Sequence, residues 1–148
     1  MEDATCPLCI SLGGTLVFQG EKFRVIRADE AGFPAFYRVV WTAHVAEFSD
    51  LSVPDRALCM VAVCEVEQAL RAHLQPTKIN LAALGNVVAH LHWHVIARFD
   101  WDTHFPAPVW AQAQRPLDVL RQDAVLAKLK LAERHMAAGL ATFQATLT

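Results

Sequence analysis

The alternation of apolar and polar positions predicts several β-strands in this chain. Residues 23–27 (Phe-Arg-Val-Ile-Arg) alternate apolar and basic side chains, which is the pattern of a half-buried strand. A Gly- and Pro-containing turn at residues 29–34 leads into Phe36 to Trp41, an aromatic and β-branched run that predicts a second strand. Further strands are expected over Lys78 to Leu84 and over Ala89 to Phe99, separated by the turn signal Gly85-Asn86.

Two segments favour helix instead. Ser52, with Pro54 and Asp55 behind it, has the composition of a helix start, and the helix is expected to run to about Leu74. Its apolar face comprises Leu58, Val61, Ala62, Val66, Ala69 and Leu70. Residues 117–147 are mostly helix-forming, with Gly139 as the expected weak point or break. Strands and helices at separate places along the chain predict an α+β fold with an antiparallel sheet.

Length, charge and hydropathy narrow the class of protein. The 148 residues suit one domain, and a net charge of −2 without a basic stripe argues against nucleic-acid binding. No apolar run reaches the roughly 18 residues that a membrane span needs. Met1-Glu2-Asp3 does not begin a signal peptide, so we expect a cytoplasmic protein with reduced thiols. Cys59 and Cys64 lie in the first predicted helix and are interpreted as core residues.

Three histidines stand at alternate positions of the last predicted strand. His90, His92 and His94 would share one face of that strand, while Leu91 and Trp93 would point to the other. Imidazole can act as a nucleophile, a general acid or a metal ligand near neutral pH. The pattern therefore predicts a chemical site, and a site that only binds metal remains an alternative to a catalytic one.

The run from His90 to Ile96 matches the signature of the histidine triad (HIT) superfamily, in which histidine and apolar residues alternate. The resemblance extends over roughly Cys6 to Arg98. It includes an N-terminal Cys-x-x-Cys, an acidic turn at Asp29, His44 before Asp50-Leu51, and Gly85-Asn86 before the triad. Residues 78–86 and 104–110 resemble a bacterial branch described as HIT-family hydrolases.

This resemblance implies a fold and an assembly. The expected fold is HIT-like, an antiparallel sheet of about five strands with one long central helix and a C-terminal helix. Residues 1–115 would form the HIT domain, and residues 116–148 a C-terminal helical extension packed on the same domain. Family members are commonly homodimers, so a homodimer is expected here too.

The resemblance also implies an activity. HIT proteins cleave at the α-phosphate of a nucleotide, here a dinucleoside polyphosphate or a nucleoside phosphoramidate, through a covalent nucleotidyl-histidine intermediate. His92 takes the place of the nucleophile, and His94 that of the histidine that contacts the phosphate and the bridging atom. No Mg²⁺ is strictly required when imidazole and backbone N–H groups stabilise the phosphoryl oxygens. The alternative is a nucleotide-binding regulatory module with little turnover.

Substrate contacts follow from the same comparison. Asn86, and by a less certain alignment Asn80, would hold the phosphate, but Val87 stands where a Ser or Thr is usual, so one phosphate contact is missing or replaced. Asp29 would face the ribose hydroxyls, or would only stabilise its turn. The base would meet apolar residues of the first strands, such as Phe23, Ile26 or Phe36.

Relatives with an N-terminal Cys-x-x-Cys imply a structural zinc site. The four ligands would be Cys6, Cys9, His44 and His90. The alternative is four uncoordinated side chains. His73 and His135 are expected at the surface, and His104 either approaches the leaving group or has no role.

Overall fold

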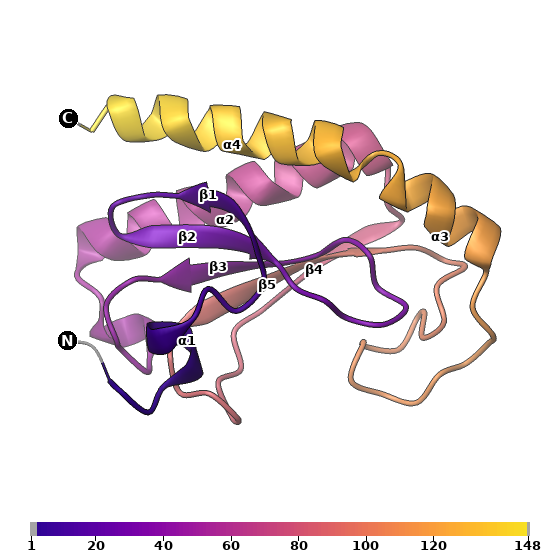
Figure 1. Ribbon diagram of the computed structural model, residues 1–148, viewed down its shortest axis with the longest axis horizontal. Helices are drawn as coiled ribbons and strands as arrows, with labels where there is room; N and C mark the ends of the chain where they lie inside the picture. The colour runs from indigo at the N-terminus through magenta and orange to yellow at the C-terminus, as the bar shows by residue number, and fades with distance from the viewer. Residues whose placement is uncertain (1–2, 148) are drawn as a thin grey trace.

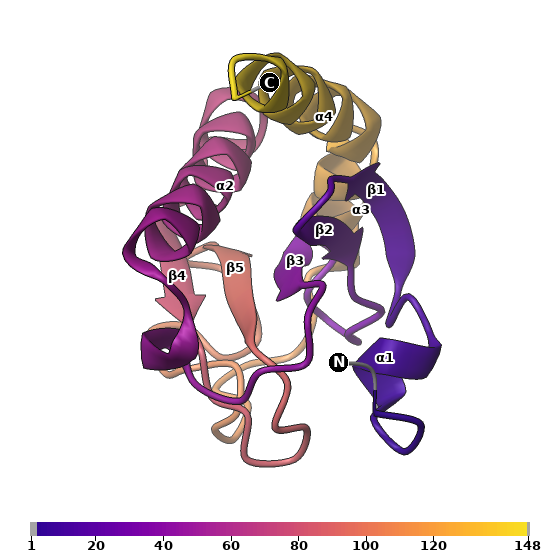
Figure 2. The same cartoon turned by 90° about the vertical axis from the view of Figure 1, so that its left-hand side faces the viewer.

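The computed structural model describes residues 3–147; Met1, Glu2 and Thr148, at the ends of the predicted domains, lie outside the described residues. A five-stranded antiparallel sheet in the order β1-β2-β3-β5-β4 forms one layer (Figure 1). Two long helices form a second layer on one of its faces, as Figure 2 shows end-on. The fold is thus α+β, as predicted.

Four of the five strands coincide with predicted ones. They are β2 (Phe23–Arg27), β3 (Phe36–Trp41), β4 (Lys78–Ala82) and β5 (His92–Arg98). The fifth, β1 (Thr15–Gln19), pairs with β2 at the edge of the sheet, and its largely exposed side chains left no clear alternation to detect. β4 ends two residues before the predicted limit, and β5 begins at His92, because the Gly85-Asn86 turn extends into a longer loop.

The long helix α2 (Val53–Leu74) begins where its capping signals predict. The Ser52 hydroxyl accepts a hydrogen bond from the Asp55 N–H at 3.3 Å, and Pro54 occupies the first turn. Cys59 lies in the core, but Cys64 is exposed, which corrects its predicted burial. Five positions along a helix turn the side chain by about 140°, so the two cysteines point in different directions.

The C-terminal segment forms two helices, α3 (Val119–Leu126) and α4 (Leu129–Ala145). The chain breaks at residues 127–128 and not at Gly139, which lies inside α4. A side chain at Gly139 would collide with the Glu65 carboxylate of α2. Gly139 therefore lies where α4 packs on α2, and it does not end the helix.

The main core lies between the sheet and the two long helices. It contains Val25, Tyr37, Val39 and Val95 from the strands, with the buried faces of α2 and α4. The other face of the sheet is covered by α1 (Pro7–Ile10) and by the loop after β5, whereas the 3₁₀ turn η1 (Phe48–Asp50) packs through Phe48 against the main core. Within residues 3–147 no helix combines the length and apolarity needed to cross a bilayer.

Candidate active site and metal centre

The sheet face away from α2 carries His92 and His94. Strand alternation places both imidazoles on this face, since Val95 and Ala97 of the same strand enter the main core. The two rings lie edge to face, with centroids 4.9 Å apart. His92 is 9% exposed and His94 5% exposed, so both rings are largely removed from water.

A backbone hydrogen bond fixes the tautomer of His92. Its Nδ1–H donates to the carbonyl oxygen of His90 at 2.6 Å, which leaves a free lone pair on Nε2. Burial lowers the pKa of His92 below its usual value, opposed by this hydrogen bond and aided by the charge of Arg38. His92 is therefore neutral at pH 7, the form in which imidazole is a nucleophile.

His94 is enclosed by aromatic rings and one arginine. Phe36 and Trp110 each approach its ring edge-on at 5.4 Å. Arg38, opposite His94 on β3, donates from Nε to the Nδ1 of His94 at 3.4 Å. Burial, then the neighbouring His92 and Arg38, lower the pKa of His94 to about 4.

Arg38 was not identified from the sequence. The available signal was a single charge inside the otherwise apolar run 36–41, but its neighbour across the sheet cannot be known before the strand pairing is known. Its Nη2 also approaches a carboxylate oxygen of Glu30 at 3.4 Å. The acidic turn therefore meets the site through Glu30, whereas Asp29 is exposed and has no side-chain partner among residues 3–147.

Phe23 and Ile26, the two predicted base contacts on β2, are both buried in hydrophobic clusters. Phe23 belongs to the main core on the opposite face of the sheet, so the structure corrects its expected role in base binding. The two residues are three positions apart in one strand and cannot share a face. Ile26 shares the face of the histidines but is fully buried beneath α1 with Leu8 and Val40, which also removes it from a ligand. Phe36 does contact His94.

No hydrogen bond joins the predicted phosphate ligands Asn80 and Asn86 to His92 or His94 within residues 3–147. The Asn80 side chain accepts a hydrogen bond from Arg98 at 2.8 Å. Asn86 and Val87 lie in the exposed loop between β4 and β5, and Val87 is 97% exposed. The Asn86 amide has no hydrogen-bond partner within the described part of the chain.

The loop after β5 is built on a buried ion pair. Arg98 and Asp102 bond through two N–H groups at 2.8 and 3.1 Å, and the carboxylate also accepts the backbone N–H groups of Phe99, His104 and Phe105. This arrangement brings Trp110 to His94. The His104 ring packs on Phe33 and bonds to Thr103 at 2.7 Å, so it is engaged within its own loop.

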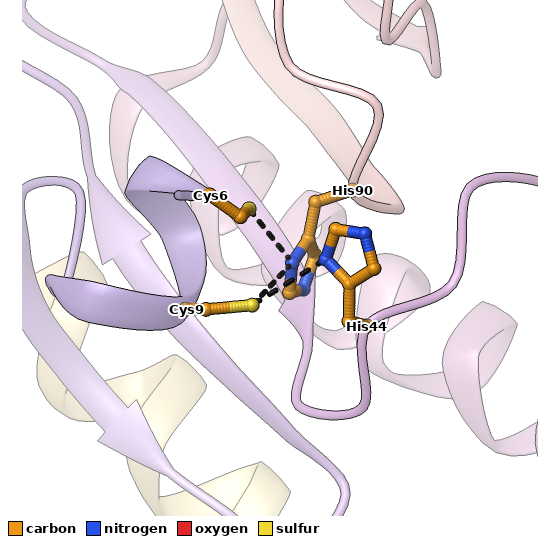
Figure 3. Close-up of side chains that lie close together, drawn as sticks. All are labelled: Cys6, Cys9, His44 and His90. Carbon is orange, nitrogen blue, oxygen red and sulfur yellow. Dashed lines mark hydrogen bonds between the residues drawn. The ribbon is translucent and has the colours of Figure 1, made fainter. Parts of the chain in front are cut away.

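The four predicted metal ligands converge (Figure 3). The Nδ1 of His90 lies 3.4 Å from the Cys6 sulfur and 3.5 Å from the Cys9 sulfur, and the Nδ1 of His44 lies 3.4 Å from Cys9. All four ligand atoms fall within 4.8 Å of one another. Tetrahedral zinc with Zn–S of about 2.3 Å and Zn–N of about 2.05 Å separates S and N ligands by about 3.5 Å.

Surrounding bonds prepare these side chains for a metal. The Nε2–H of His90 donates to the carbonyl of Trp41 at 2.6 Å, which directs the Nδ1 lone pair to the two sulfurs. Arg24 binds the carbonyls of Leu8, Ser11 and Leu12 and so ties α1 to β2. The cluster can therefore hold a metal ion.

The last two histidines form a pair elsewhere. His135 of α4 is exposed, as expected, whereas His73 of α2 is half-buried; the His73 Nε2 and the His135 Nδ1 are 3.0 Å apart. This hydrogen bond joins the two long helices.

Comparison with solved structures identifies similar folds. A histidine triad protein from Bradyrhizobium japonicum is 26% identical, with a TM-score of 0.68 over 86% of this chain and 93% of that one. A histidine triad protein from Marinobacter aquaeolei is 24% identical, with a TM-score of 0.66 over 85% and 93% of the two chains. A Zn-bound histidine triad family protein from Mycobacterium smegmatis is 20% identical, with a TM-score of 0.53 over 88% and 86%.

Sequence comparison gives the family. No curated protein matches the chain. The sequence model of the HIT domain matches residues 12–101, more than half of the chain, and this segment contains all five strands, α2 and the three histidines. The chain therefore belongs to the HIT domain family, a superfamily of nucleotide-binding proteins and nucleotide hydrolases.

Proposed function

We propose that the protein is a nucleotide hydrolase or nucleotidyl transferase that acts at the α-phosphate through a covalent nucleotidyl-His92 intermediate. Its substrates would be dinucleoside polyphosphates or nucleoside phosphoramidates. The observation that carries this proposal is the 2.6 Å hydrogen bond from the Nδ1 of His92 to the His90 carbonyl. It holds the ring in the tautomer whose Nε2 lone pair can attack phosphorus.

The first step makes one bond and breaks one. Nε2 of His92 attacks the α-phosphorus, and the bond from phosphorus to the bridging atom breaks. The imidazole then carries a positive charge, and the His90 carbonyl stabilises it through Nδ1–H. His94 lies beside His92, where it can donate a hydrogen bond to the departing atom.

The second step releases the nucleotide. Water attacks the nucleotidyl-imidazole, the N–P bond breaks, and His92 returns to its neutral form; another acceptor in place of water gives transfer. Arg38 supplies a permanent positive charge next to His94, so phosphate charge can be stabilised without a bound Mg²⁺.

The metal we assign to Cys6, Cys9, His44 and His90 is Zn²⁺. Two thiolates and two imidazoles fill its four positions, which is the composition of a structural site without a place for substrate. These residues would fix α1 against the sheet and hold His90 in place. The His90 carbonyl in turn orients the nucleophile.

Replacement of the nucleophile tests the catalytic proposal. The variant His92→Ala is expected to lose at least about a thousandfold in kcat/KM, because no other side chain can form the intermediate. His73→Ala, which removes a half-buried histidine of α2 that pairs with His135 away from the site, is the matched control and should keep full activity. Mass spectrometry of quenched wild-type protein should find the nucleotidyl adduct on His92. Equal rates for His92→Ala and wild type on diadenosine polyphosphates and adenosine phosphoramidate would contradict the proposal.

One observation favours a second candidate, a nucleotide-binding regulatory module with little turnover. Asn86, in the place of a phosphate contact, has no side-chain hydrogen bond to the site within residues 3–147, and the hydrocarbon side chain of Val87 cannot form one. This candidate predicts nucleotide binding by wild type and by His92→Ala alike, with no adduct and no turnover in either.

A further inference from the structure

Three arginines lie on the sheet face that carries the histidines. Arg24 of β2, Arg38 of β3 and Arg98 of β5 all occupy positions of the same register parity as His92 and His94. An arginine on this face is available to a substrate only where the protein has not already satisfied its N–H groups.

Arg24 and Arg98 already use their N–H groups in hydrogen bonds within the protein. Arg24 is 8% exposed and donates to three backbone carbonyls. Arg98 is 2% exposed and bonds to Asp102, to Asn80 and to the carbonyl of Ala107. Arg24 thus stabilises the position of α1, and Arg98 stabilises the loop after β5.

Arg38 differs in each respect. Its side chain is 23% exposed, and its two polar contacts, to His94 and to Glu30, are both long at 3.4 Å. Its remaining N–H groups have no partner among residues 3–147. It also stacks against the ring of Phe36, 5.5 Å from the centroid, which fixes the side chain next to His94.

The contact with Arg38 also determines what His94 can do. A guanidinium N–H can only donate, so the Nδ1 of His94 accepts and its single proton lies on Nε2. A second proton would have to enter Nδ1 against the adjacent positive charge. His94 is therefore a neutral hydrogen-bond donor, in agreement with the lowering of its pKa.

The geometry points to Arg38 as the residue that makes this site selective for nucleoside phosphoanhydrides over phosphoramidates. The inference rests on the proposed function and names the substrate class within it. Arg38 binds the anionic phosphate of the leaving group. Without substrate, the Glu30 carboxylate contacts the Arg38 guanidinium, and the phosphate takes the place of this carboxylate when substrate binds.

Cleavage of the P–O bond of a phosphoanhydride and cleavage of the P–N bond of a phosphoramidate differ in whether the leaving group must be protonated. When Nε2 of His92 displaces a phosphate, the P–O electron pair leaves on oxygen as a phosphate anion, which is stable near neutral pH. When it displaces an amine, the P–N pair leaves on nitrogen, which must gain a proton as the bond breaks. Neutral His94 beside Arg38 can stabilise the first leaving group but is a poor acid for the second.

The test compares one diadenosine polyphosphate with adenosine phosphoramidate. Wild type should have the higher kcat/KM for the diadenosine polyphosphate. Arg38→Gln should lower that value by about ten- to a hundredfold, the effect of a hydrogen bond to a charged group, and so lower the ratio between the two substrates about tenfold or more. Arg38→Lys, which keeps the charge, should retain most of the ratio, and Glu30→Gln should lower KM for the diadenosine polyphosphate.

Arg27→Gln is the matched control. Arg27 lies in the same sheet on the opposite face, paired with Glu133, and its loss changes the net charge equally. The Arg27→Gln variant should have the same ratio of kcat/KM values for the two substrates as wild type. An unchanged ratio in Arg38→Gln, or a wild-type preference for the phosphoramidate, would overturn the inference while the proposed function stands.

Binding separates the two proposals if wild type hydrolyses neither substrate. In that case the proposed function fails, and the affinities of AMP and ADP still test Arg38. Arg38→Gln should weaken ADP about tenfold more than AMP, because only ADP carries the second phosphate. Equal losses for AMP and ADP would overturn the inference.

Discussion

At the scale of single residues, we expect the protonation of His92 to determine the pH dependence of the proposed activity. Burial lowers the pKa of His92 below 6.5, and its neutral form is the proposed nucleophile. We expect kcat/KM to stay constant from pH 8 down to 6.5 and to fall only in more acidic solution. A pH–rate profile measures this fall in kcat/KM at acidic pH, and His73→Ala is the control for an unrelated histidine. A fall that begins above pH 6.5 would contradict it.

The same scale shows what the sequence could and could not predict of the site. His92 and His94 were identified because strand alternation is a property of neighbours along the chain. The cluster of Cys6, Cys9, His44 and His90 followed only from the family resemblance. Arg38, Glu30 and Trp110 were missed, because they reach His94 across strands or from a loop, and single-sequence patterns do not contain those pairings.

At the scale of elements, Gly139 lies in the contact between α2 and α4, next to the Glu65 side chain. Glycine inside a helix costs about 1 kcal/mol relative to alanine, and only the end of the flexible Glu65 side chain opposes an added methyl group. We expect Gly139→Ala to raise the free energy of unfolding by up to about 1 kcal/mol in urea titrations.

The neighbouring position provides the control. Ala138→Gly, on the exposed side of α4, should lower the free energy of unfolding by about 1 kcal/mol. A destabilised Gly139→Ala would mean that Glu65 cannot move away. Helix α2 was predictable because its cap and apolar face are local, whereas the break at residues 127–128 reflects packing of α3 and α4 against different parts of the fold.

At the scale of the whole molecule, the cluster of Cys6, Cys9, His44 and His90 brings together distant parts of the chain as a proposed zinc site. Protein purified without chelator should contain one Zn²⁺ per chain, and chelation should lower the melting temperature, because α1 loses its attachment to the sheet. Metal analysis and thermal unfolding measure both quantities.

Cysteine variants localise that effect. Cys6→Ser and Cys9→Ser should reproduce the chelated melting temperature, while Cys64→Ser, an exposed thiol on α2, should behave as wild type. Wild-type protein without zinc, or equal metal content in Cys6→Ser and Cys64→Ser, would contradict the assignment.

His90 serves the two centres with different parts of the same residue. Its imidazole faces the sulfurs of α1, while its carbonyl holds the ring of His92. Every residue type at position 90 has a backbone carbonyl. The group that orients the His92 ring therefore does not depend on the side chain at position 90. Replacing the His90 side chain would therefore remove one proposed metal ligand and leave in place the carbonyl that bonds to His92.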